Sequence, residues 1–297
     1  MKNRKWIIAL IVFLSVIMVI VSVFFVSLLR NGFKMPNLRW NLQVSDDLIV
    51  DKTYEETFNR IVIDSTAGEI HIKRSSTEDV KAVVYGDKDS TLVETKNHVL
   101  KVEFSKQIRT GFHFIFNQKS AKIEIELPAD YSGEIHIKNN YGNVFIDEFL
   151  DANIDIEEDC GDVEVLGGNI VNVNNNYGDI TIGKANIADI NEECGDVKVS
   201  HVNDITVENS YGDIEIKTVN NYLNLENDCG DIEVKNLNIN KDSYIKNDLG
   251  DIELGNTNEI FIDAKTDLGD VKIQNNYNKS DITLKIKNDC GDIEVNN

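Results

Sequence analysis

The stretch NSYGDIEI, residues 209–216, recurs with small changes through the second half of the chain. Each copy places a Tyr, Cys or Leu before a glycine and, in all but the first copy, an aspartate after it. The other copies are NNYGNVFI (139–146), EDCGDVEV (158–165), NNYGDITI (175–182), EECGDVKV (192–199), NDCGDIEV (227–234), NDLGDIEL (247–254), TDLGDVKI (266–273) and NDCGDIEV (288–295).

The spacing of these copies indicates the fold class. Successive motif glycines are 17 to 22 residues apart. A period of this size is typical of solenoids, in which each repeat contacts only its neighbours. The segments between the glycines alternate apolar and polar residues with a period of two, as strands do, and they lack a helical stripe. We therefore predict an all-β protein, a β-solenoid similar to a parallel β-helix, with about nine rungs.

The motif glycine is predicted to be a corner of each rung. Around Gly212, Ile205 and Val207 share one strand parity, whereas Ile214 and Ile216 fall on the other. A strand changes its inward parity only through a bend or bulge, which glycine permits because it lacks a Cβ. The predicted corners are Gly142, Gly161, Gly178, Gly195, Gly212, Gly230, Gly250, Gly269 and Gly291.

The residue before the glycine alternates between Tyr and Cys along the first six copies. This alternation predicts an interior seam in which large side chains lean over small ones. Cys160, Cys194 and Cys229 are successively two rungs apart, and Cys290 is three rungs further along the sequence. Two rungs separate Cα atoms by roughly 10 Å, which is beyond the reach of a disulfide. We predict four unpaired, buried thiols that act as small hydrophobes.

A polar column is predicted three positions before the glycine, where six copies carry Asn. Stacked asparagines hydrogen-bond their amides from strand to strand. Glu158 and Glu192 interrupt this column. We predict that they point outward into solvent; if they pointed inward, burial would raise their pKa values.

The aspartates after the glycine would stack in a column of like charges. Carboxylates one rung apart repel by roughly 0.9 kcal/mol even at the dielectric constant of water. Either each carboxylate accepts backbone N–H groups at its own corner, or cations bind there, because calcium takes six to eight oxygen ligands. The second interpretation also uses the acids found two positions before some glycines. The calcium candidates are Asp159, Asp162, Asp228, Asp231, Asp248, Asp251, Asp267, Asp270, Asp289 and Asp292.

The charge distribution excludes one class of partner. The chain has a net charge of -21, and residues 131–297 hold 35 acidic residues against 12 lysines and no arginine. This acidic half should repel nucleic acid and anionic lipid.

An enzyme is not expected, and neither is a cofactor. The acids belong to the repeat, so no unique acid pair stands out as it does in glycosidases. His71 and His136 occupy the same place in the two GEIHIK segments (68–73 and 133–138), which leaves a two-histidine metal site as a minor alternative. The sequence shows no nucleophile elbow, phosphate-binding loop or zinc spacing.

The N-terminus is predicted to be a membrane anchor. Residues 6–29 contain no charge and no proline, and as a helix they would span roughly 36 Å. A cleaved signal peptide would have a shorter apolar region and a small-residue cleavage site. We predict four parts: an anchor over 1–30, a juxtamembrane linker over 31–59, a strand-rich N-terminal part over 60–132 that includes a first repeat at Gly68, and the repeat solenoid over 133–297.

These features together resemble a known family. The opening strand RIVIDSTAGEIHI, the closing IEIELP and the YGDI/CGDV repeats are similar to the bacterial "putative adhesin" domain of unknown function, in particular to its membrane-anchored, LiaG-like members. The resemblance covers roughly residues 58–297. It implies a β-solenoid on the outer side of a Gram-positive cytoplasmic membrane and a role in the envelope-stress response. It implies no catalytic residues.

We therefore expect a non-enzymatic, extracytoplasmic binding or scaffold module. A calcium-dependent adhesive rod is the first alternative, and an envelope polysaccharide-active enzyme is the second. The chain ends at CGDIEVNN, directly after a repeat. Solenoids normally cap such an edge, so we expect this C-terminal edge to be covered by another envelope protein or by a second copy.

Overall fold

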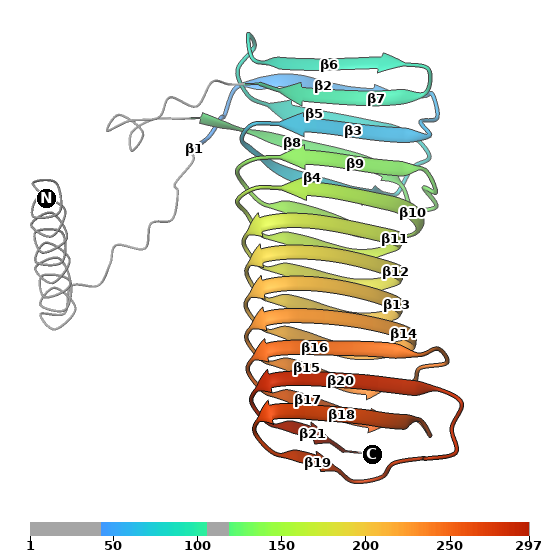
Figure 1. Ribbon diagram of the computed structural model, residues 1–297. Helices are drawn as coiled ribbons and strands as arrows, with labels where there is room; N and C mark the ends of the chain where they lie inside the picture. Colours follow the sequence, from blue (N-terminus) through green and yellow to red (C-terminus); the bar gives the residue numbers. More distant parts are fainter. Residues whose placement is uncertain (1–42, 106–118, 297) are drawn as a thin grey trace, which may run out of the picture. The chain divides into compact units, whose positions relative to one another are not determined.

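The computed structural model describes residues 43–105 and 119–296, and these residues wind into a coil of stacked, mostly parallel strands (Figure 1). The described part of the chain is all-β, as predicted, and its rungs form a β-solenoid of about nine turns. No helix within these residues is long and apolar enough to cross a membrane. The predicted anchor at 6–29 lies outside the described residues.

Five long strands form the middle of the rod. Each begins just after one motif glycine, bends once between its two halves, and ends just before the next glycine. They are β10 (Val144–Glu158), β11 (Val163–Tyr177), β12 (Ile180–Cys194), β13 (Val197–Tyr211) and β14 (Ile214–Cys229).

These strands pair in parallel along both halves, so equivalent residues stack from rung to rung. Val163 lies opposite Ile180 in the first half, and Val171 lies opposite Ala188 in the second. Each rung therefore contributes one short stretch to each of two faces, and the inward side chains of the two faces form one core of Ile, Val and Leu. Each fully buried aliphatic side chain contributes roughly 1.5–3 kcal/mol to folding.

In the C-terminal part the two halves of a rung are separate strands. One face carries β16 (Ser243–Leu249), β20 (Thr283–Cys290) and β18 (Phe261–Leu268); the other carries β15 (Ile232–Leu237), β17 (Ile252–Thr257), β21 (Ile293–Val295) and β19 (Val271–Ile273).

The last rung in sequence is not the last rung in space. Strand β20 pairs with β16 on one side and with β18 on the other, and β21 lies between β17 and β19 in the same way. The rung made of β20 and β21 is thus inserted between two earlier rungs (Figure 1). The prediction that the final CGDIEV segment forms the open edge is wrong, because that edge belongs to β18 and β19.

The N-terminal strands close the other end of the rod. They are β1 (Gln43–Val44), β2 (Leu48–Tyr54), β3 (Arg60–Ser65), β4 (Gly68–Ser75), β5 (Val80–Tyr85), β6 (Thr91–Lys96), β7 (Val99–Phe104), β8 (Lys119–Pro128) and β9 (Glu134–Asn139). Strands β3 and β4 form a rung between β7–β8 and β9–β10. Antiparallel pairs β2–β5, β5–β8 and β6–β7 then replace the parallel stacking.

Two segments singled out in the sequence take different places in the structure. The predicted linker 31–59 includes β2, whose residues 48–54 pair with β5 rather than remaining free of structure. The two GEIHIK segments are not equivalent, because the first, β4, stacks on the first half of β10 and the second, β9, stacks on its second half. They therefore lie on different faces.

Replacing Gly212 by alanine should destabilise the rod. Gly212 has a φ of 142°, and an added Cβ would overlap the carbonyl oxygen of Gly195 in the preceding rung. Backbone strain of this kind costs about 1–3 kcal/mol, so the melting temperature should fall by several degrees. The matched control is Gly167→Ala, whose Cβ first meets side-chain carbons of Glu148 and Leu150 that can move. Equal melting temperatures for the two variants would contradict this reading of the corner.

Candidate binding surface along the glycine corner

The glycine corner is the place where neighbouring rungs come closest. The Gly212 N–H donates to the Cys229 carbonyl of the next rung, and the Ile214 N–H donates to the Asp231 carbonyl, both at 2.9 Å. Seven of the nine motif glycines have φ between 119° and 158°, which disfavours any residue with a Cβ. At all nine glycines, an added Cβ would overlap a glycine carbonyl of the adjacent rung.

The aspartates after the glycine form a hydrogen-bonded ladder. Except in the terminal rung of Asp270, each Oδ1 accepts the backbone N–H of the equivalent aspartate in the next rung, for example Asp196 from Asp213 at 3.1 Å and Asp213 from Asp231 at 2.8 Å. The bond therefore joins two rungs, whereas we had predicted a bond within one corner. Asn143 fills the same role at the start of the ladder, where its Oδ1 accepts the N–H of Asp162. At this corner a neutral amide oxygen thus accepts the hydrogen bond that a carboxylate oxygen accepts at the other corners.

The column three positions before the glycine is buried and bonds to the backbone. The Asn209 Nδ2 donates to the carbonyls of Gly195 and Gly212, at 3.3 and 3.1 Å. The side chains therefore clamp consecutive corners together, and the predicted amide-to-amide ladder does not occur in this column. Such a ladder exists instead at the opposite bend of the rungs, where the Asn203 Nδ2 donates to Asn186 Oδ1 at 2.9 Å. The sequence analysis missed this second asparagine column.

Glu158 and Glu192 point inward, contrary to the prediction that they would face solvent. Their exposed fractions are 3% and 1%. Each Oε1 accepts a backbone N–H, from Cys160 and Cys194 respectively. In each carboxyl group the buried Oε2 has no hydrogen-bond partner among the described residues.

Burial is the main cause of the pKa shifts of these two groups. It raises the pKa of Glu158 to about 8 and that of Glu192 to about 7, although hydrogen bonds from the neighbouring backbone and from Asn139 and Asn175 oppose the shift. A protonated carboxyl group can donate, as the Asn amide does, so the column accommodates these two residues best in their neutral form.

The residues before the glycines line an outer ridge, and the predicted interior seam is wrong, although Tyr141 at the first corner is partly buried against the core. Tyr211 is 62% exposed and Leu268 is 70% exposed, while Cys160 and Cys229 are half-buried and Cys194 is exposed. All four cysteines are free, but none is buried as predicted. Because the chain bends over the two residues before the glycine, the period of two no longer places this side chain inside.

The stacking order makes the ridge more regular than the sequence. In sequence the last residues are Leu249, Leu268 and Cys290, but in space Cys290 lies between the two leucines. Large and small residues therefore alternate over all nine rungs. We call this line the corner ridge; in spatial order it contains Tyr141, Cys160, Tyr177, Cys194, Tyr211, Cys229, Leu249, Cys290 and Leu268.

The calcium candidates lie next to the corner ridge, one residue after the glycine or two before it. Several are already engaged: Asp159 accepts from Asn176, and Asp248 and Asp267 form ion pairs at 2.8 and 2.7 Å. Among residues 43–105 and 119–296, no three His, Cys, Asp or Glu side chains are grouped as metal ligands would be.

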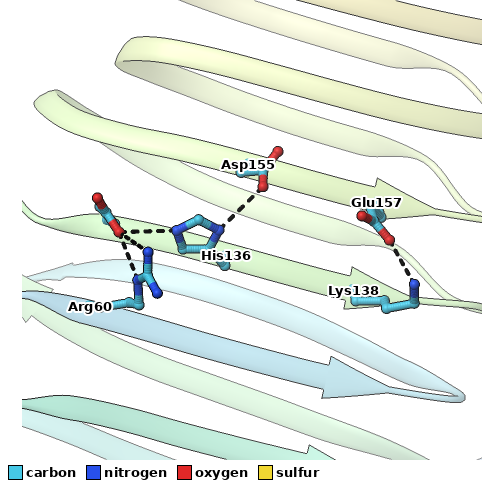
Figure 2. Close-up of polar contacts among 6 residues, drawn as sticks. Arg60, His136, Lys138, Asp155 and Glu157 are labelled. Carbon is cyan, nitrogen blue, oxygen red and sulfur yellow. Dashed lines mark hydrogen bonds and ion pairs between the residues drawn. The ribbon is translucent and has the colours of Figure 1, made fainter.

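A cluster of ion pairs joins strands β3, β9 and β10 on the outer surface (Figure 2). Its in-register pairs are Arg60–Glu134, His136–Asp155 and Lys138–Glu157. The ring nitrogens of His136 lie 3.2 Å from Glu134 and 3.2 Å from Asp155, so only the doubly protonated ring donates to both. Hydrogen bonds from Arg60 and His136 lower the pKa of Glu134.

This cluster argues against the two-histidine metal site. His136, on β9, lies between the carboxylates of Glu134 and Asp155. His71 lies on β4, with its ring centroid 5.4 Å from that of Phe145. The two histidines are on different faces. Exposed ion pairs of this kind contribute little to stability, so we regard the cluster as a surface network that joins three strands.

The described surface has open hollows of about 300–350 Å³. One hollow is lined by Asp155, Glu157, Asp189 and Glu208 together with asparagines. Asp155 and Glu157 are engaged by His136 and Lys138.

The chain belongs to the Toastrack DUF4097 family, whose model matches residues 58–202 and 168–297. No curated protein matches it. Among solved structures, a putative adhesin from Bacteroides fragilis NCTC 9343 is 19% identical, with 85% of this chain and 98% of that chain covered and a TM-score of 0.42. A putative adhesin from Parabacteroides merdae ATCC 43184 is 12% identical, with 85% of this chain and 97% of that chain covered and a TM-score of 0.41. A putative lipid binding protein from Parabacteroides distasonis ATCC 8503 is 14% identical, with 84% of this chain and 96% of that chain covered and a TM-score of 0.37.

The stability of the protein should fall as the pH rises from 5 to 8. The raised pKa values mean that folded Glu158 and Glu192 bind protons which the unfolded chain, with its usual glutamate pKa near 4.5, has lost. Their contribution is therefore fully present at low pH and is lost as the pH approaches 8. Thermal unfolding of a Glu158→Gln/Glu192→Gln variant should depend less on pH than that of the wild type.

The control for this experiment is Glu193→Gln/Glu208→Gln, which makes the same two replacements at exposed positions. This control should keep the pH profile of the wild type. Parallel profiles for the wild type and the Glu158→Gln/Glu192→Gln variant would show that the buried carboxyl groups do not titrate as described.

Substitutions of Asp213 should separate hydrogen bonding from cation binding. Asp213→Asn keeps the Oδ1 acceptor and removes a repulsive charge, so the variant should be at least as stable as the wild type. Asp213→Ala loses the bond from the Asp231 N–H and should lose about 1 kcal/mol. Calcium or a chelator should not change any of the three melting temperatures. A rise with calcium in the wild type alone would instead identify the column as a cation site.

Proposed function

We propose that this protein is a non-enzymatic binding or scaffold module of the bacterial cell envelope. In this proposal residues 6–29 anchor it in the cytoplasmic membrane of a Gram-positive bacterium, and the β-solenoid lies outside the cytoplasm. The uncharged run of 24 residues supports the anchor. Membership of the Toastrack DUF4097 family, together with the resemblance to LiaG-like members, supports a role in the envelope-stress response.

The observation that carries this proposal is the corner ridge. Monomeric proteins seldom expose a continuous line of large apolar side chains, and such lines mark interaction sites. Here Tyr177, Tyr211 and Leu249 are each more than half exposed and recur every second rung. A ridge of this length suits an extended partner better than a small substrate.

The flanking charges restrict the kind of partner. Asp196 and Asp213 follow the glycines on one side of the ridge, and Asp159, Asp228 and Asp289 precede it. Acidic rims of this kind favour cationic or neutral partners and oppose anionic lipid. We therefore place the binding surface on the ridge and its acidic borders, away from the membrane surface.

Two native thiols offer a direct test. Cys194 and Cys290 are exposed on the ridge, so a membrane-impermeant maleimide that carries a photoreactive group should label intact cells. Illumination should then cross-link one envelope component, which mass spectrometry identifies. The matched control has its four cysteines replaced by serine and carries Leu166→Cys on an outer face, where Leu166 is 38% exposed.

The control should also be labelled on intact cells but should capture no partner. Labelling only after cell lysis would contradict the extracytoplasmic location. Equal labelling and equal capture at both positions would contradict the ridge as the binding surface.

A further inference from the structure

The terminal rung leaves one edge of the solenoid unpaired. Strands β18 and β19 pair only with β20 and β21, and no described strand lies on their other side. Val271 is 40% exposed, whereas its stacked equivalents Ile252 and Ile293 are buried. The core therefore ends at this edge with apolar side chains still in contact with solvent.

Part of the edge is already closed. The Asn276 side chain takes the place of a neighbouring strand: its Oδ1 accepts the Ile262 N–H at 2.9 Å, and its Nδ2 donates to the Ile262 carbonyl at 2.8 Å. These bonds show that the N–H and C=O groups of Ile262 point away from β20. Since strand residues alternate in this respect, the groups of Ala264 and Thr266 point to the same open side.

The opposite end of the rod does not offer a complementary edge. There the antiparallel strands β5 and β6 pair with β8 and β7, and β2 pairs with β5. Parallel stacking of rungs therefore cannot continue from the open end of one copy to the closed end of another. A second copy can extend the sheet through the same open edge, related by a two-fold axis.

The outward charges of β18 fit such a two-fold arrangement. Lys265 and Asp267 flank Thr266 on the outer face and form an ion pair of 2.7 Å within the chain. In an antiparallel pair centred on Thr266, Lys265 of each copy would lie directly opposite Asp267 of the other. Charged residues on an edge normally prevent pairing with foreign strands, but here they complement the same strand in the opposite direction.

The register is set by what remains free. A pair centred on Ala264 would also oppose charges, Asp263 against Lys265, but it would need the Ile262 groups that Asn276 occupies. A pair centred on Thr266 leaves the Ile262 groups with Asn276. Its central hydrogen bonds join the Thr266 backbone groups of the two copies, and the Leu268 carbonyl keeps its bond from the Gly291 N–H at 2.9 Å.

We propose that two copies of this protein associate end to end, through antiparallel pairing of their β18 strands about Thr266. The association joins two rods end to end and leaves Tyr177, Tyr211 and Leu249 of the corner ridge away from the junction. It is independent of the proposed envelope partner, because it uses the end of the rod, where Leu268 is the last residue of the ridge.

A charge swap tests the association. Sedimentation of the full-length protein in detergent, across a concentration series, should show a monomer–dimer equilibrium. Lys265→Glu sets Glu against Asp267 of the second copy and should weaken the dimer at least tenfold. Lys265→Glu/Asp267→Lys restores opposite charges across the axis and should restore the dimer. A wild type that stays monomeric, or a dimer of equal strength in Lys265→Glu, would overturn the proposal.

The symmetry axis itself gives a second test that does not depend on affinity. In a chain whose four cysteines are replaced by serine, Thr266→Cys places two thiols on the axis, close enough for a disulfide. Oxidation should give a covalent dimer. Asp263→Cys is the matched control, because its two copies would lie roughly 20 Å apart and should stay uncoupled. Equal cross-linking at both positions, or none at Thr266→Cys, would exclude this register.

Discussion

The close approach of backbone at the glycine corner is the constraint on which the rest of the structure depends. Where the Gly212 N–H reaches the next rung and the Gly195 carbonyl faces Gly212, no space remains for a Cβ. This contact fixes the vertical spacing of the rungs and the place where each rung turns. The aliphatic core could tolerate changes in composition, but the corner requires glycine once per turn.

Because the rungs stack in register, each residue beside the corner belongs to a column of equivalent residues. Inside, Asn209 and its equivalents bond to the glycine carbonyls, and the buried Glu158 and Glu192 take two places in that column. Outside, the aspartates exchange hydrogen bonds between rungs. Two residues before these aspartates, the corner ridge alternates large and small side chains, which gives neighbouring rungs room for aromatic rings. Stability and the proposed binding surface thus come from the same repeat.

The repeat period and the parity change at Gly212 were sufficient to predict the fold class, because both are local properties of the sequence. The outward position of the Tyr211 side chain could not be predicted in this way, since a period of two places it inside with the buried Asn209, and only the bend turns it outward. The inward direction of the Glu192 side chain could not be predicted either, because a glutamate side chain is normally exposed to water. The order of the last rungs was beyond local reasoning, because TDLGDVKI and NDCGDIEV could each stack on β16 and β17. The second asparagine column was visible only as scattered Asn residues at the far bend.

Hydrogen exchange of individual backbone amides tests whether the corners are the bonded joints between rungs. We expect that the N–H groups of Asp196, Asp213 and Asp231, although their side chains lie at the surface, exchange only on global unfolding, because each donates to the aspartate of the preceding rung. The Gly269 N–H, which has no rung beyond it, should exchange much faster. Rapid exchange at all three aspartates would contradict the account, because the corners would then not be the bonded joints between rungs.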